Sequence, residues 1–139
     1  MIDGWVLDTN VVLDWLVFDD ASMRAPAARL RAGAARWLSC PAMRAELDDV
    51  LARPAFARRG DFRAALRALL DSHSSLLADP ATDARLRCRD ADDQVFIDLA
   101  LQHRAALLLT RDRALLELAP HAAACGLRIT RPDALAPTR

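Results

Sequence analysis

The chain contains no lysine, and this absence excludes several classes of phosphate-handling protein. A P-loop needs a lysine on the phosphates within a glycine-rich segment, and no segment of that form is present. Response-regulator receivers and phosphatases of the haloacid-dehalogenase type also use a lysine, together with an aspartate after the first strand. All three classes are therefore poor matches to this sequence.

Long apolar runs and close cysteine–histidine pairs are also missing. No run approaches the ~20 apolar residues that span a bilayer. Residues 1–5 lack the basic start of a signal peptide, so we expect a cytosolic protein that does not enter a membrane. The cysteines, Cys40, Cys88 and Cys125, are far apart and odd in number, which favours buried free thiols. Zinc binding would need paired cysteines or histidines at close spacing.

The charged residues balance to a formal net charge of +0, and every basic side chain is an arginine. Arginine binds phosphate through two parallel hydrogen bonds, which suits a nucleic-acid backbone. The alternative is a compositional bias, since alanine is also abundant and a neutral chain is weak evidence for nucleic-acid binding. A length of 139 residues with 53% hydrophobic residues predicts a single globular domain over residues 1–139.

Apolar segments of strand length alternate with helical segments along the chain. We expect strands at residues 4–7, 35–39, 75–78, 105–109 and 127–130, and helices at residues 11–18, 22–33, 41–53, 61–72, 91–103 and 112–118. Ser22 and Asp61 are candidate N-caps, and Gly33 is a candidate helix stop. This alternation predicts a three-layer α/β fold, in which helices cover both faces of a parallel sheet.

Four acidic side chains follow the ends of predicted strands. Asp8 comes directly after the first strand, and Asp112 comes three residues after the fourth. Glu46 and Asp93 lie early in the helices that follow the second and third strands. Sites of open α/β sheets form at the carboxyl ends of the strands. We therefore expect these four side chains to meet at one edge of the sheet.

Helix periodicity separates these acids from their neighbours. It places Glu46 and Asp93 at the border of buried helix faces, and it directs Asp48, Asp49 and Asp98 toward solvent. Some of these acids also have possible structural roles. Aspartates such as Asp90 and Asp112 are good N-caps, and Asp93 interacts favourably with the dipole at the start of a helix. Asp8 is the hardest acid to explain structurally, because it ends a buried strand and no lysine is available to pair with it.

A cluster of carboxylates indicates a bound cation. Acids at close range repel one another and raise their own pKa values unless a cation neutralises them. Oxygen ligands without histidine or cysteine suit one or two Mg²⁺ or Mn²⁺ ions. Such ions orient water and stabilise charge on a phosphate, so the cluster favours phosphodiester hydrolysis.

The segments that carry the four acids resemble the motifs of PIN domains. They are residues 6–11 (VLDTNV), 45–51 (AELDDVL), 88–96 (CRDADDQVF) and 109–113 (LTRDR), in the order that the family has them. The resemblance runs over nearly the whole chain. It is greatest to the branch described as toxin components of toxin–antitoxin pairs.

This resemblance implies a five-stranded sheet in the order 3-2-1-4-5 and Mg²⁺-dependent cleavage of RNA. It further implies a homodimer and a small antitoxin protein as a partner. The implied metal-binding and catalytic residues are Asp8, Glu46, Asp93 and Asp112, with Asn10, Thr110 and Asp90 as supporting residues and Asn10 orienting Asp8. Ala114 and Gln94 replace acids that many relatives carry, which bears on how tightly a second ion binds.

Other functions stay open at this point. A PIN fold without catalysis would serve as an RNA-binding or protein-interaction module, whereas a structure-specific DNA nuclease would need extra loops. Four arginines, Arg58, Arg59, Arg63 and Arg67, are candidates for RNA contact, because three of them recur at i, i+4 and i+8. The alternative for these arginines is an ordinary solvated helix face.

Overall fold

The computed structural model describes residues 2–83 and 85–135, and its centre is a five-stranded parallel sheet. The strands are β1 (Asp3–Leu7), β2 (Ala35–Ser39), β3 (Ser74–Leu76), β4 (Leu107–Leu109) and β5 (Arg128–Thr130). Their order in the sheet is β3-β2-β1-β4-β5, which confirms the expected topology. β1 therefore lies in the middle, with Trp5 paired to Trp37 of β2 and to Leu107 of β4.

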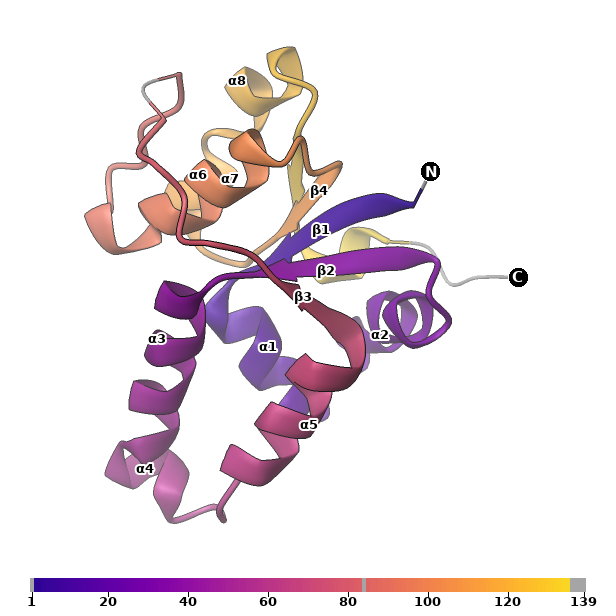
Figure 1. The fold of residues 1–139 in the computed structure, drawn as a ribbon, viewed down its shortest axis with the longest axis vertical. Coiled ribbons are helices and arrows are strands. Elements are labelled where there is room, and N and C mark those ends of the chain that lie inside the picture. Colours follow the sequence, from indigo (N-terminus) through magenta and orange to yellow (C-terminus); the bar gives the residue numbers. More distant parts are fainter. Residues whose placement is uncertain (1, 84, 136–139) are drawn as a thin grey trace.

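Helices cover both faces of the sheet, as Figure 1 shows. One face carries α1 (Thr9–Leu16), α2 (Arg24–Arg31), α3 (Pro41–Ala52) and α5 (Arg63–His73), and the other carries α6 (Gln94–Gln102), α7 (Arg113–Leu116) and α8 (Ala119–Ala124). The remaining elements are the short α-helix α4 (Pro54–Ala57) and the 3-10 helices η1 (Ala21–Met23), η2 (Ala91–Asp93) and η3 (Pro132–Ala134). Within the described residues, no helix is long and apolar enough to cross a membrane.

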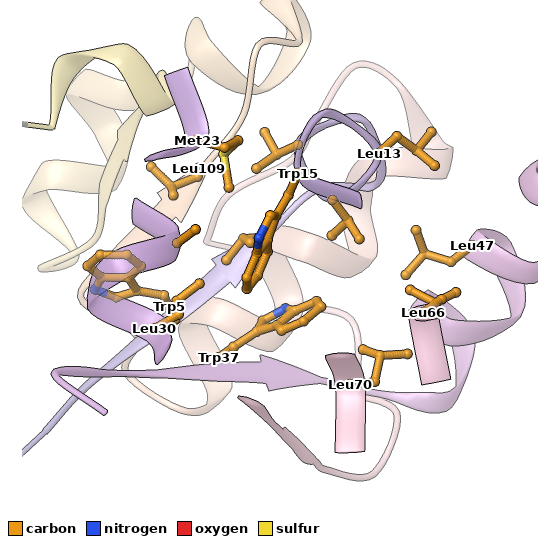
Figure 2. Packing of buried hydrophobic residues seen from close by; sticks show 14 of the residues in the cluster. Trp5, Leu13, Trp15, Met23, Leu30, Trp37, Leu47, Leu66, Leu70 and Leu109 are labelled. Carbon is orange, nitrogen blue, oxygen red and sulfur yellow. The ribbon is translucent and has the colours of Figure 1, made fainter. Parts of the chain in front are cut away.

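The alternation of side chains along the strands builds two separate cores. In β1, Trp5 and Leu7 face the core under α1, α2, α3 and α5, whereas Val6 faces the core under α6. The first core is centred on Trp15 and Trp37, whose rings are 5.7 Å apart (Figure 2). Successive side chains of a strand point to opposite faces of a sheet. An all-apolar end of β1 therefore anchors both layers and fixes the position of Asp8.

Several element boundaries differ from the sequence-based expectation. β3 and β4 each have 3 residues, fewer than we expected. The helix at 22–33 divides into η1 and α2, and its N-cap is Asp20 rather than Ser22. Gly33 follows this helix with a φ of 72°, as expected of a helix stop. The short helices α4 and α8 were not predicted, because neither is long enough to display a helical period.

The cysteines are not uniformly buried. Cys40 is buried, Cys88 is half-buried and Cys125 is exposed, and all three are free thiols. The expectation of three buried thiols is therefore wrong for Cys125, which directly follows α8, one of the unpredicted helices.

Candidate metal centre and active site

Asp8 is held rigidly between the two central strands. Its backbone N–H donates to Leu109 O at 3.1 Å, which extends the pairing of β1 with β4. Its side chain caps α1, because Oδ1 accepts a hydrogen bond from Val11 N at 2.9 Å. The Thr110 hydroxyl donates to Asp8 Oδ2. Asp8 is only 2% exposed, so the position and orientation of its carboxylate are fixed by the fold.

Thr110 links Asp8 to Asp112. The Thr110 Oγ1 atom accepts a hydrogen bond from the backbone N–H of Asp112 at 2.9 Å, and Thr110 is fully buried. The same hydroxyl donates its hydrogen to Asp8 Oδ2, so Thr110 accepts from one acid's backbone and donates to the other acid's side chain. Asp112 in turn caps α7 through Oδ1, which accepts from Ala114 N at 2.8 Å. One short segment after β4 therefore positions both acids.

Asp93 brings a third carboxylate to the same place. It lies at the junction of η2 and α6, and carboxylate oxygens of Asp90, Asp93 and Asp112 lie within 4.8 Å of one another. Asp93 Oδ2 is buried and has no hydrogen-bond partner among the described residues. A buried carboxylate oxygen without a donor is costly. A bound cation or a proton shared with Asp112 would remove that cost.

Glu46 completes the group from α3. Thr9, the first residue of α1, donates its hydroxyl hydrogen to Glu46 Oε2 at 2.8 Å. Glu46 and the carboxylates of Asp8, Asp93 and Asp112 line one pocket of about 180 Å³. The structure thus brings together four acids that are far apart in the sequence.

Burial and mutual repulsion raise the pKa values of two of these acids. Burial raises the pKa of Asp8 to about 6, although the Thr110 and Val11 hydrogen bonds act in the opposite direction. Burial, together with the neighbouring carboxyls of Asp112 and Asp90, raises the pKa of Asp93 to about 7. Both shifts arise because the negative form is poorly solvated and adjacent to like charge. The pocket therefore favours either protons or a metal cation.

No basic side chain of the described residues forms an ion pair with the four acids. None of the ion pairs in these parts of the chain involves Asp8, Glu46, Asp93 or Asp112. Arg111 is their neighbour in sequence, but its guanidinium binds Asp14 and Asp20 at 3.2 Å and the Ser22 hydroxyl at 2.9 Å. All-oxygen ligands, a buried oxygen without a donor and no basic partner together fit a divalent cation of the Mg²⁺ or Mn²⁺ type.

Comparison with known protein families agrees with this geometry. The family model of the PIN domain matches residues 5–114. The chain belongs to the PIN-domain family. PIN domains are generally nucleases and typically use divalent metal ions, and the acidic pocket of this member fits such a site. The comparison with curated proteins gives no match.

Two of the expected supporting residues behave differently in this PIN domain. Asn10 is exposed and lines the pocket, but it does not orient Asp8, which takes its hydrogen bonds from Val11 and Thr110. The reason is geometric: as the N-cap of α1, Asp8 bonds to the N–H three residues ahead. Asp90 lies closer to the acids than we expected, since its carboxylate belongs to the group formed with Asp93 and Asp112.

The expectation that Asp98 faces solvent is wrong. Asp98 is 5% exposed, and its Oδ1 accepts hydrogen bonds from Asp83 N at 2.8 Å and from Gln94 Nε2 at 2.9 Å. Asp83 lies in the segment between β3 and η2, which packs over this side of α6. Helix periodicity describes only the helix itself, so it cannot predict that another segment buries one of its polar residues. Asp48 and Asp49 are exposed, as expected.

Gln94 is fully used in holding the segment before α6. Its amide nitrogen donates to Leu86 O at 2.9 Å as well as to Asp98, and its oxygen accepts from Cys88 N at 2.8 Å. Gln94 does not line the acidic pocket. The glutamine in place of an acid therefore fixes the loop that carries Asp90 toward the site.

The four arginines proposed for RNA contact do not form one helix face. α5 begins at Arg63, so Arg58 and Arg59 lie outside it, before the turn at Gly60. The Arg58 side chain donates to Pro54 O at 3.1 Å, and the Arg59 guanidinium lies 4.8 Å from the centre of the Phe18 ring. Only Arg63 and Arg67 share a face, where they line a hollow with Arg44 and Asp48 between α3 and α5.

The pocket also contains residues that were not singled out from the sequence, among them Thr9, Arg53 and Phe56. Thr9 holds Glu46, while Arg53 and Phe56 line the pocket from the segment that joins α3 to α4. Thr9 could have been found from its place beside Asp8 at the start of a helix. Arg53 continues the face of Glu46 and Val50 at helical spacing, which is a signal that the sequence does contain.

Proposed function

We propose that this chain is a Mg²⁺- or Mn²⁺-dependent endoribonuclease that hydrolyses RNA phosphodiester bonds. The observation that carries this proposal is the buried Asp93 Oδ2, which lies without a hydrogen-bond donor among the described residues, in a group of carboxylates that has no basic partner there. Such a group costs folding free energy unless it binds a cation. Membership in a family of nucleases gives that cation a role in phosphodiester hydrolysis.

Different residues of the pocket would bind the cation, position the acids and accept a proton during hydrolysis. Asp8, Glu46, Asp93 and Asp112 would hold the cation, and Thr110 keeps Asp8 and Asp112 in register through its two hydrogen bonds. When bound, the ion would supply positive charge to the phosphate and lower the pKa of a water. Glu46, whose Oε2 accepts a hydrogen bond from Thr9, would also accept the proton of the attacking water through Oε1. The water oxygen forms the new bond to phosphorus, and the leaving oxygen takes a proton from solvent water as its own bond to phosphorus breaks.

The rate of RNA cleavage by the Asp8→Asn variant is the direct test of this function. Loss of one metal ligand should reduce the rate by more than ~100-fold, because even the outer partners of metal ligands are worth 10–100-fold. Asp48→Asn provides the matched control, since Asp48 is exposed to solvent and does not line the pocket. An Asp8→Asn protein that is folded and cleaves at the wild-type rate would reject the proposal in favour of an inactive binding module.

We also propose that the chain is the toxin of a toxin–antitoxin pair and that it acts on cytosolic RNA as a homodimer. The support is its resemblance to that branch of the family. Cytosolic expression in a bacterial host should arrest growth, Asp8→Asn should not, and a small protein encoded beside the chain should restore growth. Normal growth with abundant wild-type protein would contradict the toxin role, and a monomer mass in sedimentation would contradict the dimer.

A further inference from the structure

An arginine and an aromatic side chain line the acidic pocket beside the four carboxylates. Arg53 and Phe56 come from the segment that joins α3 to α4. Neither has a role in binding a cation: a guanidinium repels it, and a phenyl ring offers no ligand atom. Their presence in a pocket of acids therefore needs a different explanation.

Arg53 is free to bind an anion. It is exposed, and no ion pair in the described parts of the chain includes it. Glu46, Val50 and Arg53 follow one another at helical spacing and all line the pocket. Seven residues of helix rise by about 10 Å. Arg53 directly follows α3, about two turns beyond Glu46 on the same side, which suits a neighbouring phosphate of the same strand.

Phe56 is held in place by the first core and by Phe18. It packs against the first core, and its ring meets the Phe18 ring edge-on, with ring centres 6.0 Å apart. Phe18 is 43% exposed, and the Arg59 guanidinium covers it at 4.8 Å. This stack gives Arg59 a packing role beside Phe18. It leaves Phe56 as a rigid aromatic surface that lines the pocket.

We propose that Arg53 and Phe56 bind the nucleotide that flanks the scissile phosphate, with its base stacked on Phe56 and its phosphate on Arg53. This inference rests on the proposed nuclease function and specifies its substrate. A base stacks on a protein aromatic ring only when it has left its own helix. The flanking nucleotide of the substrate is therefore unpaired. Phe56 and Arg53 act as positioning residues, so they affect substrate binding more than the chemical step.

Binding of a labelled single-stranded RNA of about ten nucleotides tests the inference, since sites of this kind cover several nucleotides. The measurements use an Asp93→Asn background, which keeps the RNA intact. Phe56→Leu should weaken binding roughly tenfold, the loss of one stacking contact, whereas Phe56→Tyr should restore it. Arg53→Ala should reduce the log–log dependence of binding on salt by about 0.7.

Two matched variants control for effects on folding. Phe62→Leu changes another half-buried phenylalanine that packs against the same core but does not line the pocket. Arg36→Ala removes an exposed arginine of β2 that does not line the pocket. Both variants should bind RNA like the background protein.

RNAs with an abasic site at each position in turn locate the stacked base. One position should exist where loss of the base weakens binding to the background protein, which retains Phe56, but has no effect on binding to the Phe56→Leu variant. An equal loss in both proteins at every position would mean that no base stacks on Phe56.

The inference and the nuclease function fail in different ways. In proteins with an intact acidic pocket, Phe56→Leu and Arg53→Ala should raise the KM for RNA while leaving kcat within about twofold. Neither variant should weaken Mn²⁺ binding, and Arg53→Ala should tighten it, because a repelling charge is lost. If Asp8→Asn abolishes cleavage but Phe56→Leu and Arg53→Ala match their controls in RNA binding and KM, the inference is overturned and the nuclease function stands.

Discussion

Two aspartates of this protein are almost equally buried, yet their surroundings differ completely. Asp98 is 5% exposed and receives two hydrogen bonds on one oxygen, from the segment before α6 and from Gln94. Asp8 is 2% exposed and also receives two hydrogen bonds, but it shares its pocket with three other acids. Burial of a carboxylate therefore does not by itself mark a functional site.

The difference lies in what each carboxylate contributes to its region. The Asp98 carboxylate accepts hydrogen bonds from Asp83 N and from the Gln94 amide, and these bonds stabilise the folded chain. Asp8 lies in a group of acids, and its pKa is raised first by burial and to a smaller extent by the charges of Asp112 and Asp14. The acidic pocket therefore suits a cation, because a bound cation would neutralise the carboxylates that destabilise the folded chain. The predictions below change one region at a time.

Replacement of Asp98 should have the largest effect on stability. Asp98→Ala leaves the Asp83 N–H and the Gln94 amide without their acceptor, which should lower the free energy of unfolding by about 2 kcal/mol. Urea denaturation measures this loss. Mn²⁺ affinity should not change, because Asp98 does not line the acidic pocket. An equal loss of Mn²⁺ affinity in Asp98→Ala and Asp8→Asn would erase the distinction between the two regions.

The metal-free protein should respond to pH through Asp8 and Asp93. Their folded-state pKa values of about 6 and about 7 lie above the ordinary value of 3.8, so the folded state binds more protons between these limits. Relative to higher pH, these two carboxyls therefore add to the free energy of unfolding. This addition is fully present below pH 4 and is lost as the pH rises to about 7. In EDTA, Asp8→Asn should be more stable than wild type at pH 8 by about 1–2 kcal/mol.

That advantage of Asp8→Asn should shrink at pH 5, where the wild-type Asp8 carboxyl is largely protonated. Denaturation of both proteins at the two pH values measures the difference directly. A stability difference that is independent of pH would mean that Asp8 does not carry unfavourable charge in the folded protein.

Exposed acids near the site should matter least. Asp48→Asn and Asp49→Asn should change the free energy of unfolding by no more than ~0.5 kcal/mol, as for ordinary surface positions. Mn²⁺ affinity should be nearly unchanged, because neither residue lines the pocket with Glu46. Calorimetric titration of both variants and of Glu46→Gln compares them. A large loss at Asp49 with Glu46→Gln harmless would show that Asp49, not Glu46, is the acid of α3 that belongs to the site.

The sequence predicted the sheet and the meeting of the acids for a clear physical reason. Apolar strands such as residues 4–7 and 105–109 must be buried on both faces, and parallel strands bring their carboxyl ends to one edge. Asp8 and Asp112 follow two such strands, so their proximity depends on topology alone. Glu46 and Asp93 needed only the phase of one helix in addition.

The sequence could not predict contacts that depend on irregular segments or on how two elements pack, because no repeating pattern of apolar residues encodes them. Asp98 is buried by a segment with no regular structure, and a helical pattern describes only its own helix. The pairing of Thr9 with Glu46 joins the start of α1 to α3 and depends on the angle between two helices. The position of Phe56 depends on α4, which is only 4 residues long. Each of these features follows from packing rather than from local sequence.

Thermal melting of wild type, Asp8→Asn and Asp98→Asn in EDTA, Mg²⁺ and Mn²⁺ tests the central claim most directly. Asp98→Asn is the matched control, because the same substitution at an equally buried position keeps the Oδ1 acceptor. A cation at a hundredfold excess over its Kd adds about 2.7 kcal/mol to stability, which should raise the Tm of wild type and Asp98→Asn by roughly 5 °C or more, with Mn²⁺ above Mg²⁺. Asp8→Asn should show a much smaller rise. Equal rises, or none, in wild type and Asp8→Asn would contradict a metal site at these four acids.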